Sequence, residues 1–291
     1  MTYRKRWGDR KDGRRLRSLP PMNRIVPYIM TTRTGASDFF KERIETTNLD
    51  TYIRTKRAEG MKGFGMLHLI LAAYVRTVSQ RPGINRYIGG QEVYARDNIV
   101  IAMVVKKELK LDAEETVIKL ELAPDATAAD VYEGMNRLIM DNRGLDNSSD
   151  FDQLTKILNY IPRPILKFTV WFLRLLDYYN KLPMSLQNLS PFHASFFITS
   201  MGSLGIPPIY HHLYDFGNVP IFCSYGAKYT ENEIARDGTV VRHQYVDYTF
   251  VVDERICDGH YFASSLKYMK DLLRHPEVLD TPPAQIVPDI D

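Results

Sequence analysis

The chain has 291 residues, of which 44% are hydrophobic and 25% charged, with a net charge of +3. This is the composition of an ordinary globular protein with enough chain to bury a substantial core, which argues against a disordered or fibrous protein. Two cysteines, Cys223 and Cys257, are too few for a disulfide framework or a cysteine metal cluster, and they suit a reducing cytoplasm. We expect a cytoplasmic protein without a signal peptide, because residues 1–18 are basic and contain no apolar stretch.

Residues 1–19 form a basic N-terminal arm that ends at Pro20-Pro21. Residues 1–18 hold eight Lys or Arg against Asp9 and Asp12, a net charge of +6, so the rest of the chain sums to −3. We expect the arm to pack across a neighbouring subunit or to stay solvated. Contact with nucleic acid, an acidic partner or a membrane surface is the alternative.

The first third of the chain mixes helical and strand patterns. Met22–Met30 is a short apolar segment, which we interpret as a helix interrupted at Pro27. Phe39–Thr55 alternates between apolar and polar residues and predicts a strand. Phe64–Ser79 has apolar residues at helical spacing and predicts a helix that buries one face.

Strands and a helix follow. Val93–Lys106 predicts a strand pair, with Ile99–Val105 as its buried run. Thr127 is the predicted N-cap of a helix over Ala128–Arg143, with Asp130 three residues on. Three apolar residues share one face of a further predicted strand: Ile118, Leu120 and Leu122.

The apolar centre of residues 150–190 is Ile165–Leu176. These twelve residues include two charges and are too short to span a hydrocarbon core of about 30 Å. We expect a helix that packs on the body of the domain or in an oligomer interface. A lid over an acyl-chain tunnel and an interfacial membrane helix remain open as alternatives.

Strands dominate from Phe196 to Val252. Phe196–Thr199 and Val219–Tyr225 predict two of them, and Asp237-Gly238 is the turn signal of a long hairpin. Strands combined with helices in this order indicate an α+β fold built of layers.

Five segments together resemble one family. Asp253-Glu254-Arg255-Ile256-Cys257-Asp258-Gly259 resembles the D-H-R-x-x-D-G signature of the acyltransferase component of 2-oxo acid dehydrogenase complexes, whose catalytic domain shares its fold with chloramphenicol acetyltransferase. The other four segments match in the same order: Leu67–Pro82 with Asn85–Ile88 (first long helix and strand), Phe197–Gly205 (strand and turn), Ala235–Val241 (hairpin) and Tyr261–Leu279 (closing helix).

The resemblance implies a chloramphenicol acetyltransferase-like two-layer sandwich with a mixed β-sheet, assembled as a trimer with active sites between subunits. The catalytic-like domain covers residues 20–280, with 150–190 as a helical insertion and 281–291 as a C-terminal tail. No lipoyl domain precedes it, so we expect no role as the core of a dehydrogenase complex.

Acyl transfer needs a base for the acceptor's proton and a donor that stabilises the tetrahedral oxyanion. In the resembled family the base is the signature His, whose position Glu254 occupies here. The family's oxyanion serine falls on Thr199, with Ser200 beside it. Asp258 and Gly259 keep the family's loop anchor, for which Arg24 is a candidate partner.

Glu254 admits two interpretations. A carboxylate with a pKa of about 4.3 is a poor base for a thiol of about 8.5, but burial can raise it into a useful range. Glu254 instead pairs with Arg255 or another cation if it has no catalytic role. His193 is an alternative base, since we expect it to lie close to Thr199. We expect Cys257 to be buried packing rather than a nucleophile, and the histidine spacings predict no metal site.

The resemblance thus implies an acyltransferase with CoA or acyl-CoA as substrate and no permanently bound cofactor. It would transfer an acyl group to a small-molecule or carrier acceptor that the sequence does not identify. The alternative is a catalytically inactive relative that keeps the trimer as a binding or scaffold protein.

Overall fold

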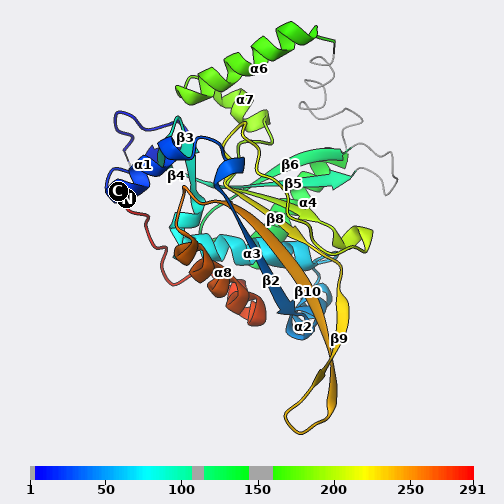
Figure 1. Cartoon of the computed structure of the whole chain (residues 1–291). Coiled ribbons are helices and arrows are strands. Elements are labelled where there is room, and N and C mark those ends of the chain that lie inside the picture. Colours follow the sequence, from blue (N-terminus) through cyan, green and yellow to red (C-terminus); the bar gives the residue numbers. More distant parts are fainter. Residues whose placement is uncertain (1–3, 107–114, 144–159) are drawn as a thin grey trace.

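A computed structural model describes residues 4–106, 115–143 and 160–291. Its centre is a mixed sheet in the order β2-β10-β8-β7-β5-β6, with β9 paired to β10 (Figure 1). The β8–β7 and β7–β5 pairs are parallel and the other pairs are antiparallel. The strands are β2 (Ser37–Glu45), β5 (Ile99–Lys106), β6 (Glu115–Leu122), β7 (Phe196–Ser200), β8 (Ile221–Tyr225), β9 (Tyr229–Ile234) and β10 (Val240–Asp253).

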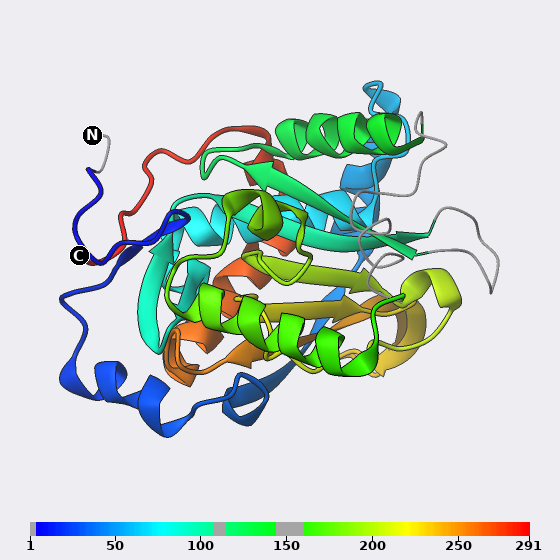
Figure 2. The ribbon, with the colours of Figure 1, turned by 90° about the horizontal axis from the view of Figure 1, so that it is seen from above.

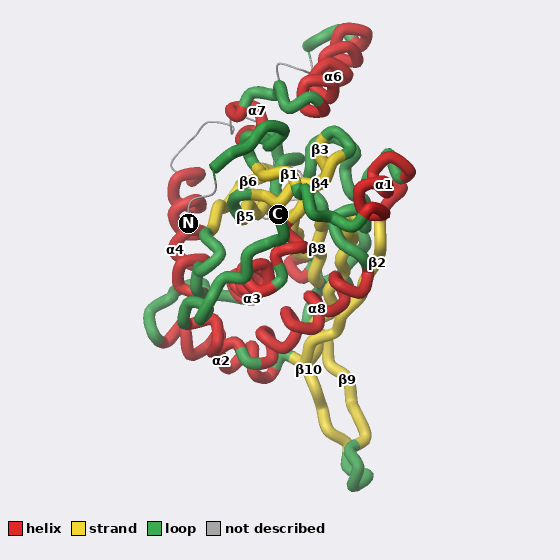
Figure 3. Tube along the Cα trace, turned by 90° about the vertical axis from the view of Figure 1, so that its left-hand side faces the viewer, coloured by secondary structure: helices red, strands yellow, loops and turns green. Residues whose placement is uncertain are grey.

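Helices cover one face of this sheet, as the view in Figure 3 shows. The described helices are α1 (Pro21–Ile29), α2 (Thr47–Ala58), α3 (Met66–Gln80), α4 (Ala128–Arg143), α6 (Arg163–Tyr178), α7 (Met184–Leu189) and α8 (Gly259–Arg274). Helix α3 contacts both α4 and α8 and lies at the centre of the layer. The result is a layered α+β fold with a mixed sheet, as the sequence predicts.

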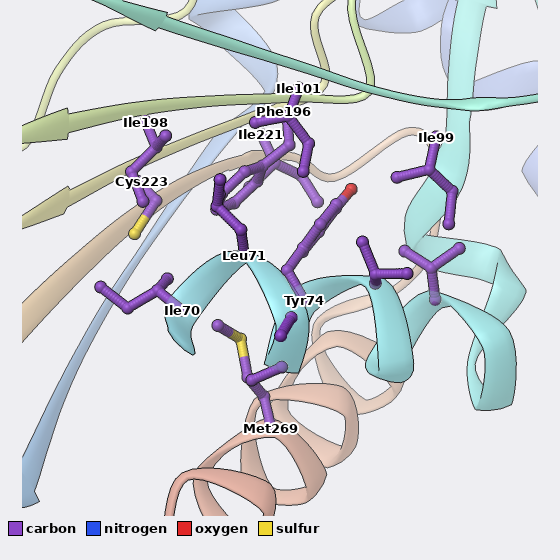
Figure 4. Close-up of a cluster of buried hydrophobic side chains, with 14 of the residues drawn as sticks. Ile70, Leu71, Tyr74, Ile99, Ile101, Phe196, Ile198, Ile221, Cys223 and Met269 are labelled. Carbon is purple, nitrogen blue, oxygen red and sulfur yellow. The ribbon is translucent and has the colours of Figure 1, made fainter. Parts of the chain in front are cut away.

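The core lies between α3 and the sheet. Side chains from α3, α8 and the strands converge there (Figure 4), and the rings of Tyr74 and Phe196 stack with centroids 4.0 Å apart. Every residue from His68 to Ser79 is buried, so α3 is enclosed on all sides rather than on the single face we expected. The predicted face of Ile118, Leu120 and Leu122 is part of this core.

The predicted strand over Phe39–Thr55 is wrong in its second half. Strand β2 ends at Glu45 and α2 begins at Thr47. Leu49, Tyr52 and Ile53 are buried at i, i+3 and i+4, which is helical spacing. Thr and Tyr residues in this segment favour strands locally, and packing against the C-terminal segment overrides that preference.

Other local predictions fare better. Helix α1 forms over the expected segment, but the predicted interruption at Pro27 is wrong, since one helix runs through it from Pro21 to Ile29. Thr127 and Asp130 form reciprocal bonds at the start of α4: the Thr127 amide donates to Asp130 Oδ2 at 2.8 Å and the Asp130 amide to Thr127 Oγ1 at 3.3 Å. Gly238 has a φ of +85° in the β9–β10 turn, a backbone conformation that favours glycine, so the predicted turn forms at Asp237-Gly238.

The basic arm packs on its own chain instead of staying solvated. Its strand β1 (Gly13–Arg15) pairs with β4 (Glu92–Arg96), which also pairs with β3 (Arg86–Gly89) in a small separate sheet. Arg10 is 2% exposed and donates to Asp177 Oδ1 at 2.6 Å. The arm also meets the C-terminus, where the Ser18 amide donates to the Asp291 carbonyl at 2.6 Å.

Among the described residues, the helix of the 150–190 segment is bonded to the body of its own domain near its C-terminal end, where Asp177 accepts from Arg10 and Tyr178 donates to Gln91. Within the described chain no residue of α6 is buried; the helix stands apart from the sheet in Figure 1 and lies across it in the view of Figure 2. Residues 150–159 lie outside the described residues.

Candidate functional site

The signature segment forms the turn from β10 to α8. Its first residue, Asp253, is fully buried and accepts bonds from Arg255 Nε at 2.7 Å and Nη2 at 2.8 Å. Arg33 Nε lies 3.4 Å from the same carboxylate. Arg33 and Arg255 are themselves 5% and 4% exposed, so one buried carboxylate holds two buried guanidinium groups. This ion cluster fixes the turn.

Glu254 projects from this fixed turn. Its amide donates to the Ala36 carbonyl at 2.9 Å, while its side chain is exposed. Partial burial, together with the nearby carboxylates of Asp38 and Asp253, raises the pKa of Glu254 above its ordinary value. Of the cations considered as partners of Glu254, Arg255 does not pair with it within the described chain, because Arg255 bonds Asp253 and, at 2.9 Å, the Met30 carbonyl.

Asp258 caps α8. Its Oδ1 accepts the Tyr261 amide at 2.7 Å, and Gly259 is the first residue of the helix. Arg24 is exposed on α1 and, among the ion pairs of the described residues, none joins it to Asp258. The anchor that we assigned to Asp258 is therefore provided by Asp253, which the sequence analysis missed although it begins the motif.

Thr199 and Ser200 are the last two residues of strand β7. Thr199 is aligned with Ser224 of β8, which is aligned with Thr249 of β10. The side chains of Thr199 and Ser200 are both half-buried. The chain then turns through Gly202–Leu204 to Gly205, whose φ of +71° is the conformation that glycine adopts without strain. This strand and turn form where the resemblance predicts them.

Glu254 and Thr199 do not meet within one chain. Glu254 follows Asp253, four residues beyond Thr249, so it lies at least about 13 Å along β10 from the level of Thr199. Two strand spacings add a lateral offset of about 10 Å, which brings the separation to about 16 Å or more. A base and an oxyanion donor at this separation cannot act on one carbonyl, so a site that uses both needs two chains.

His193 is not near Thr199 either. It precedes β7, and the three steps from Phe196 to Thr199 already span about 10 Å. The ring is 4% exposed; its Nδ1 lies 2.9 Å from Ser190 Oγ and its Nε2 3.4 Å from Asp177 Oδ2. Burial lowers its pKa. Within one chain His193 therefore does not lie close to Thr199 as expected, because the extended strand carries Thr199 away from it.

A pocket of about 410 Å³ adjoins the signature turn. Its wall includes Arg33 and Arg255 from the ion cluster and Arg174, Asp177 and Tyr178 from α6. This pocket could not be predicted from the sequence, since its residues come from five distant segments.

Cys257 is buried in the core, as expected, and burial raises its pKa to about 12, which removes it as a nucleophile. Cys223 is buried as well. Among the described residues no group of three or more His, Cys, Asp or Glu could hold a metal ion. None of the described helices has the length and apolar character needed to cross a bilayer.

No protein-family model and no curated protein matches this sequence. Solved structures do match its fold. A probable dihydrolipoamide acetyltransferase from Listeria monocytogenes 4b F2365 is similar with a TM-score of 0.56 and 12% identity, covering 92% of this chain and 95% of that one. The Azotobacter vinelandii dihydrolipoamide acetyltransferase is similar with a TM-score of 0.52 and 14% identity, covering 91% of this chain and 93% of that one.

The cubic core of the pyruvate dehydrogenase multienzyme complex is also similar, with a TM-score of 0.50, 14% identity, and 91% and 93% of the two chains covered. The chain therefore has the fold of these acyltransferase catalytic cores, as its motifs predict. Identities this low show the fold alone, so activity and assembly need their own evidence.

Proposed function

We propose that this chain is a CoA-dependent acyltransferase whose site is assembled between subunits of an oligomer, a trimer in the family it resembles. The observation that carries the proposal is the placement of Glu254. A buried ion cluster holds the turn rigid while this one carboxylate projects from it with a raised pKa. Perturbed ionisable groups on rigid supports are typical of functional sites.

In the proposed reaction, Glu254 takes the proton of an acceptor hydroxyl, amine or thiol as the acceptor attacks the thioester carbonyl. The Thr199 hydroxyl of a neighbouring subunit, with Ser200 beside it, donates to the oxyanion that forms. When the tetrahedral intermediate collapses, the C–S bond breaks and Glu254 returns the proton to the CoA sulfur. A raised pKa suits this role, because a carboxylate near its ordinary value would take the proton too weakly.

The separation of Glu254 and Thr199 supports an intersubunit site, and the multimeric core with the same fold is consistent with it. Asp253 acts as a positioning residue, because it touches neither substrate nor acceptor in this scheme. Arg255 and Gly259 shape the turn with it.

Calorimetric titration with CoA and acetyl-CoA is the first test, with a blank for thioester hydrolysis. Saturable micromolar binding supports the proposal and justifies a screen of acceptors with the Glu254→Gln and Thr199→Ala variants. No binding at millimolar ligand would overturn it and favour the inactive scaffold instead.

A complementation experiment tests the intersubunit site directly. Glu254→Gln and Thr199→Ala chains are each expected to be inactive as homo-oligomers. Co-assembled at equal ratio in a cyclic trimer, about a quarter of the sites would combine an intact Glu254 with an intact Thr199, so activity should return to about that level. Failure to regain activity in verified mixed oligomers would refute the two-chain site.

A further inference from the structure

Among the described residues, helix α6 is bonded to the rest of the molecule near its C-terminal end. Asp177 Oδ1 accepts from Arg10 Nη2 at 2.6 Å, and Tyr178 Oη donates to Gln91 Oε1 at 2.7 Å. The carbonyl of Tyr178 lies against Gly90, where an added Cβ would come within 2.4 Å. The rest of the helix extends over the body as Figure 2 shows, with no residue buried in the described chain.

The side chains of α6 form three stripes along the helix. An inner stripe is half-buried and consists of Leu166, Thr169, Leu173 and Leu176. An outer stripe at i, i+3, i+4 and i+7 is apolar and exposed, with exposed fractions of 61, 54, 44 and 37% for Phe168, Trp171, Phe172 and Leu175. A third stripe is basic and exposed: Arg163, Lys167 and Arg174.

Within α6 itself, no acidic residue lies on the exposed face beside the basic stripe. Asp177 is the only acidic residue of α6, and it is occupied by Arg10 at the anchored end. An aromatic face flanked by Lys and Arg is the pattern of a helix that lies in the interface of an anionic bilayer, with rings in the headgroup region and cations at the phosphates.

Helix α1 also exposes apolar side chains and lacks acidic ones. Burial and then the neighbouring Tyr28 raise the pKa of Tyr178, so Tyr28 of α1 lies in the neighbourhood of the anchored end of α6. Helix α1 contains no acidic residue, and its exposed apolar side chains are Met22, Ile25, Tyr28 and Ile29.

Two other occupants fit less well. A sixteen-residue helix is about 24 Å long, too short to span a core of about 30 Å. A second copy paired through α6 about a two-fold axis would set Arg163, Lys167 and Arg174 against the same three cations, which costs affinity. An anionic surface satisfies both the apolar and the basic stripe.

We propose that α6, together with α1, is an interfacial surface that binds the protein to anionic phospholipid membranes. The aromatic stripe enters the headgroup region and the basic stripe contacts the phosphates. This surface is independent of acyl transfer, so either proposal can fail while the other stands.

Trp171 reports on the proposal directly. The chain has two tryptophans, and Trp7 is 93% exposed in the arm, so Trp7→Phe leaves Trp171 as the single emitter in the full chain. With vesicles of phosphatidylcholine and phosphatidylglycerol we expect its emission to shift to the blue and the protein to float with the vesicles. Phosphatidylcholine alone should bind far less, and added salt should weaken binding.

Variants separate the two stripes. Phe168→Ser with Phe172→Ser should abolish flotation. Lys167→Gln with Arg174→Gln should lower the partition coefficient by about 10- to 30-fold, since each cation near an anionic surface contributes about fivefold. The matched control is Ile234→Ser with Val240→Ser, which removes two apolar side chains that are even more exposed (79% and 68%) from the β9–β10 hairpin and should change nothing.

Three results would overturn the proposal. One is Trp171 emission that does not change with anionic vesicles. Another is flotation that survives the Phe168 and Phe172 substitutions. The last is emission already blue-shifted without lipid, together with an oligomer mass that Phe168→Ser reduces, since this would assign the aromatic stripe to a second copy.

Discussion

Asp253 and Glu254 are adjacent in the chain and should respond in opposite ways to loss of charge. Asp253→Asn keeps the shape of the side chain but removes the buried negative charge that Arg33 and Arg255 share. Glu254→Gln changes an exposed side chain to which no described residue is paired. The first change should destabilise the fold and the second should not.

The expected size follows from the contacts. Removing one partner of a buried ion pair costs about 3–5 kcal/mol, because the remaining charge loses compensation. Here Arg33 keeps the Tyr214 carbonyl at 2.6 Å and Arg255 keeps the Met30 carbonyl at 2.9 Å. We therefore expect about 3 kcal/mol for Asp253→Asn, and less than about 0.5 kcal/mol for Glu254→Gln as for most surface changes.

Urea unfolding followed by circular dichroism, at one fixed protein concentration, measures both free energies of unfolding. If the free energies of unfolding of the Asp253→Asn and Glu254→Gln variants differ by less than about 0.5 kcal/mol, the ion cluster is not what holds the turn. The assignment of Asp253 as the anchor would then be wrong.

Three further predictions concern activity, pH and close packing. Glu254→Gln should lower turnover by about 10²- to 10⁴-fold, and wild-type activity should rise with pH through a pKa above that of an ordinary Glu; a flat profile would remove Glu254 as the base. Burial lowers the pKa of His68 to about 4, so the unfolded chain takes up this proton first as pH falls. Stability should thus drop by about 2 kcal/mol from pH 7 to 5, less so in His68→Gln, as denaturant titrations at each pH would show. Gly217→Ala should lower the melting temperature clearly, since a Cβ there meets the Phe192 carbonyl oxygen at 2.0 Å; Gly238→Ala, with a similar φ and open space, is the control and should change it much less.

Much of the fold could be predicted from the sequence because its signals are local. The Thr127–Asp130 cap needs only four consecutive residues, and the Asp237-Gly238 turn needs only two. Family-like motifs placed β7, β10 and α8 correctly for the same reason. Thr199 could be placed on its strand without knowledge of any distant contact.

The site itself depended on contacts that local patterns do not contain. Asp253 is an anchor because Arg33, more than two hundred residues earlier, lies beside it. His193 is close to Thr199 in sequence, yet an extended strand separates them in space. The sequence also could not show that Glu254 and Thr199 lie at different ends of the sheet, since strand order and register set that separation.

Sequence by itself determined the layered α+β class, the element boundaries that carry caps and turns, and the amphipathic character of α6. Tertiary structure decided that Thr47–Ala58 is a helix, that the arm pairs its charges within the chain, and that α6 leaves its aromatic stripe exposed. The physical reason is that propensity and periodicity act within a few residues. Burial and charge pairing depend on which distant segments the fold brings together.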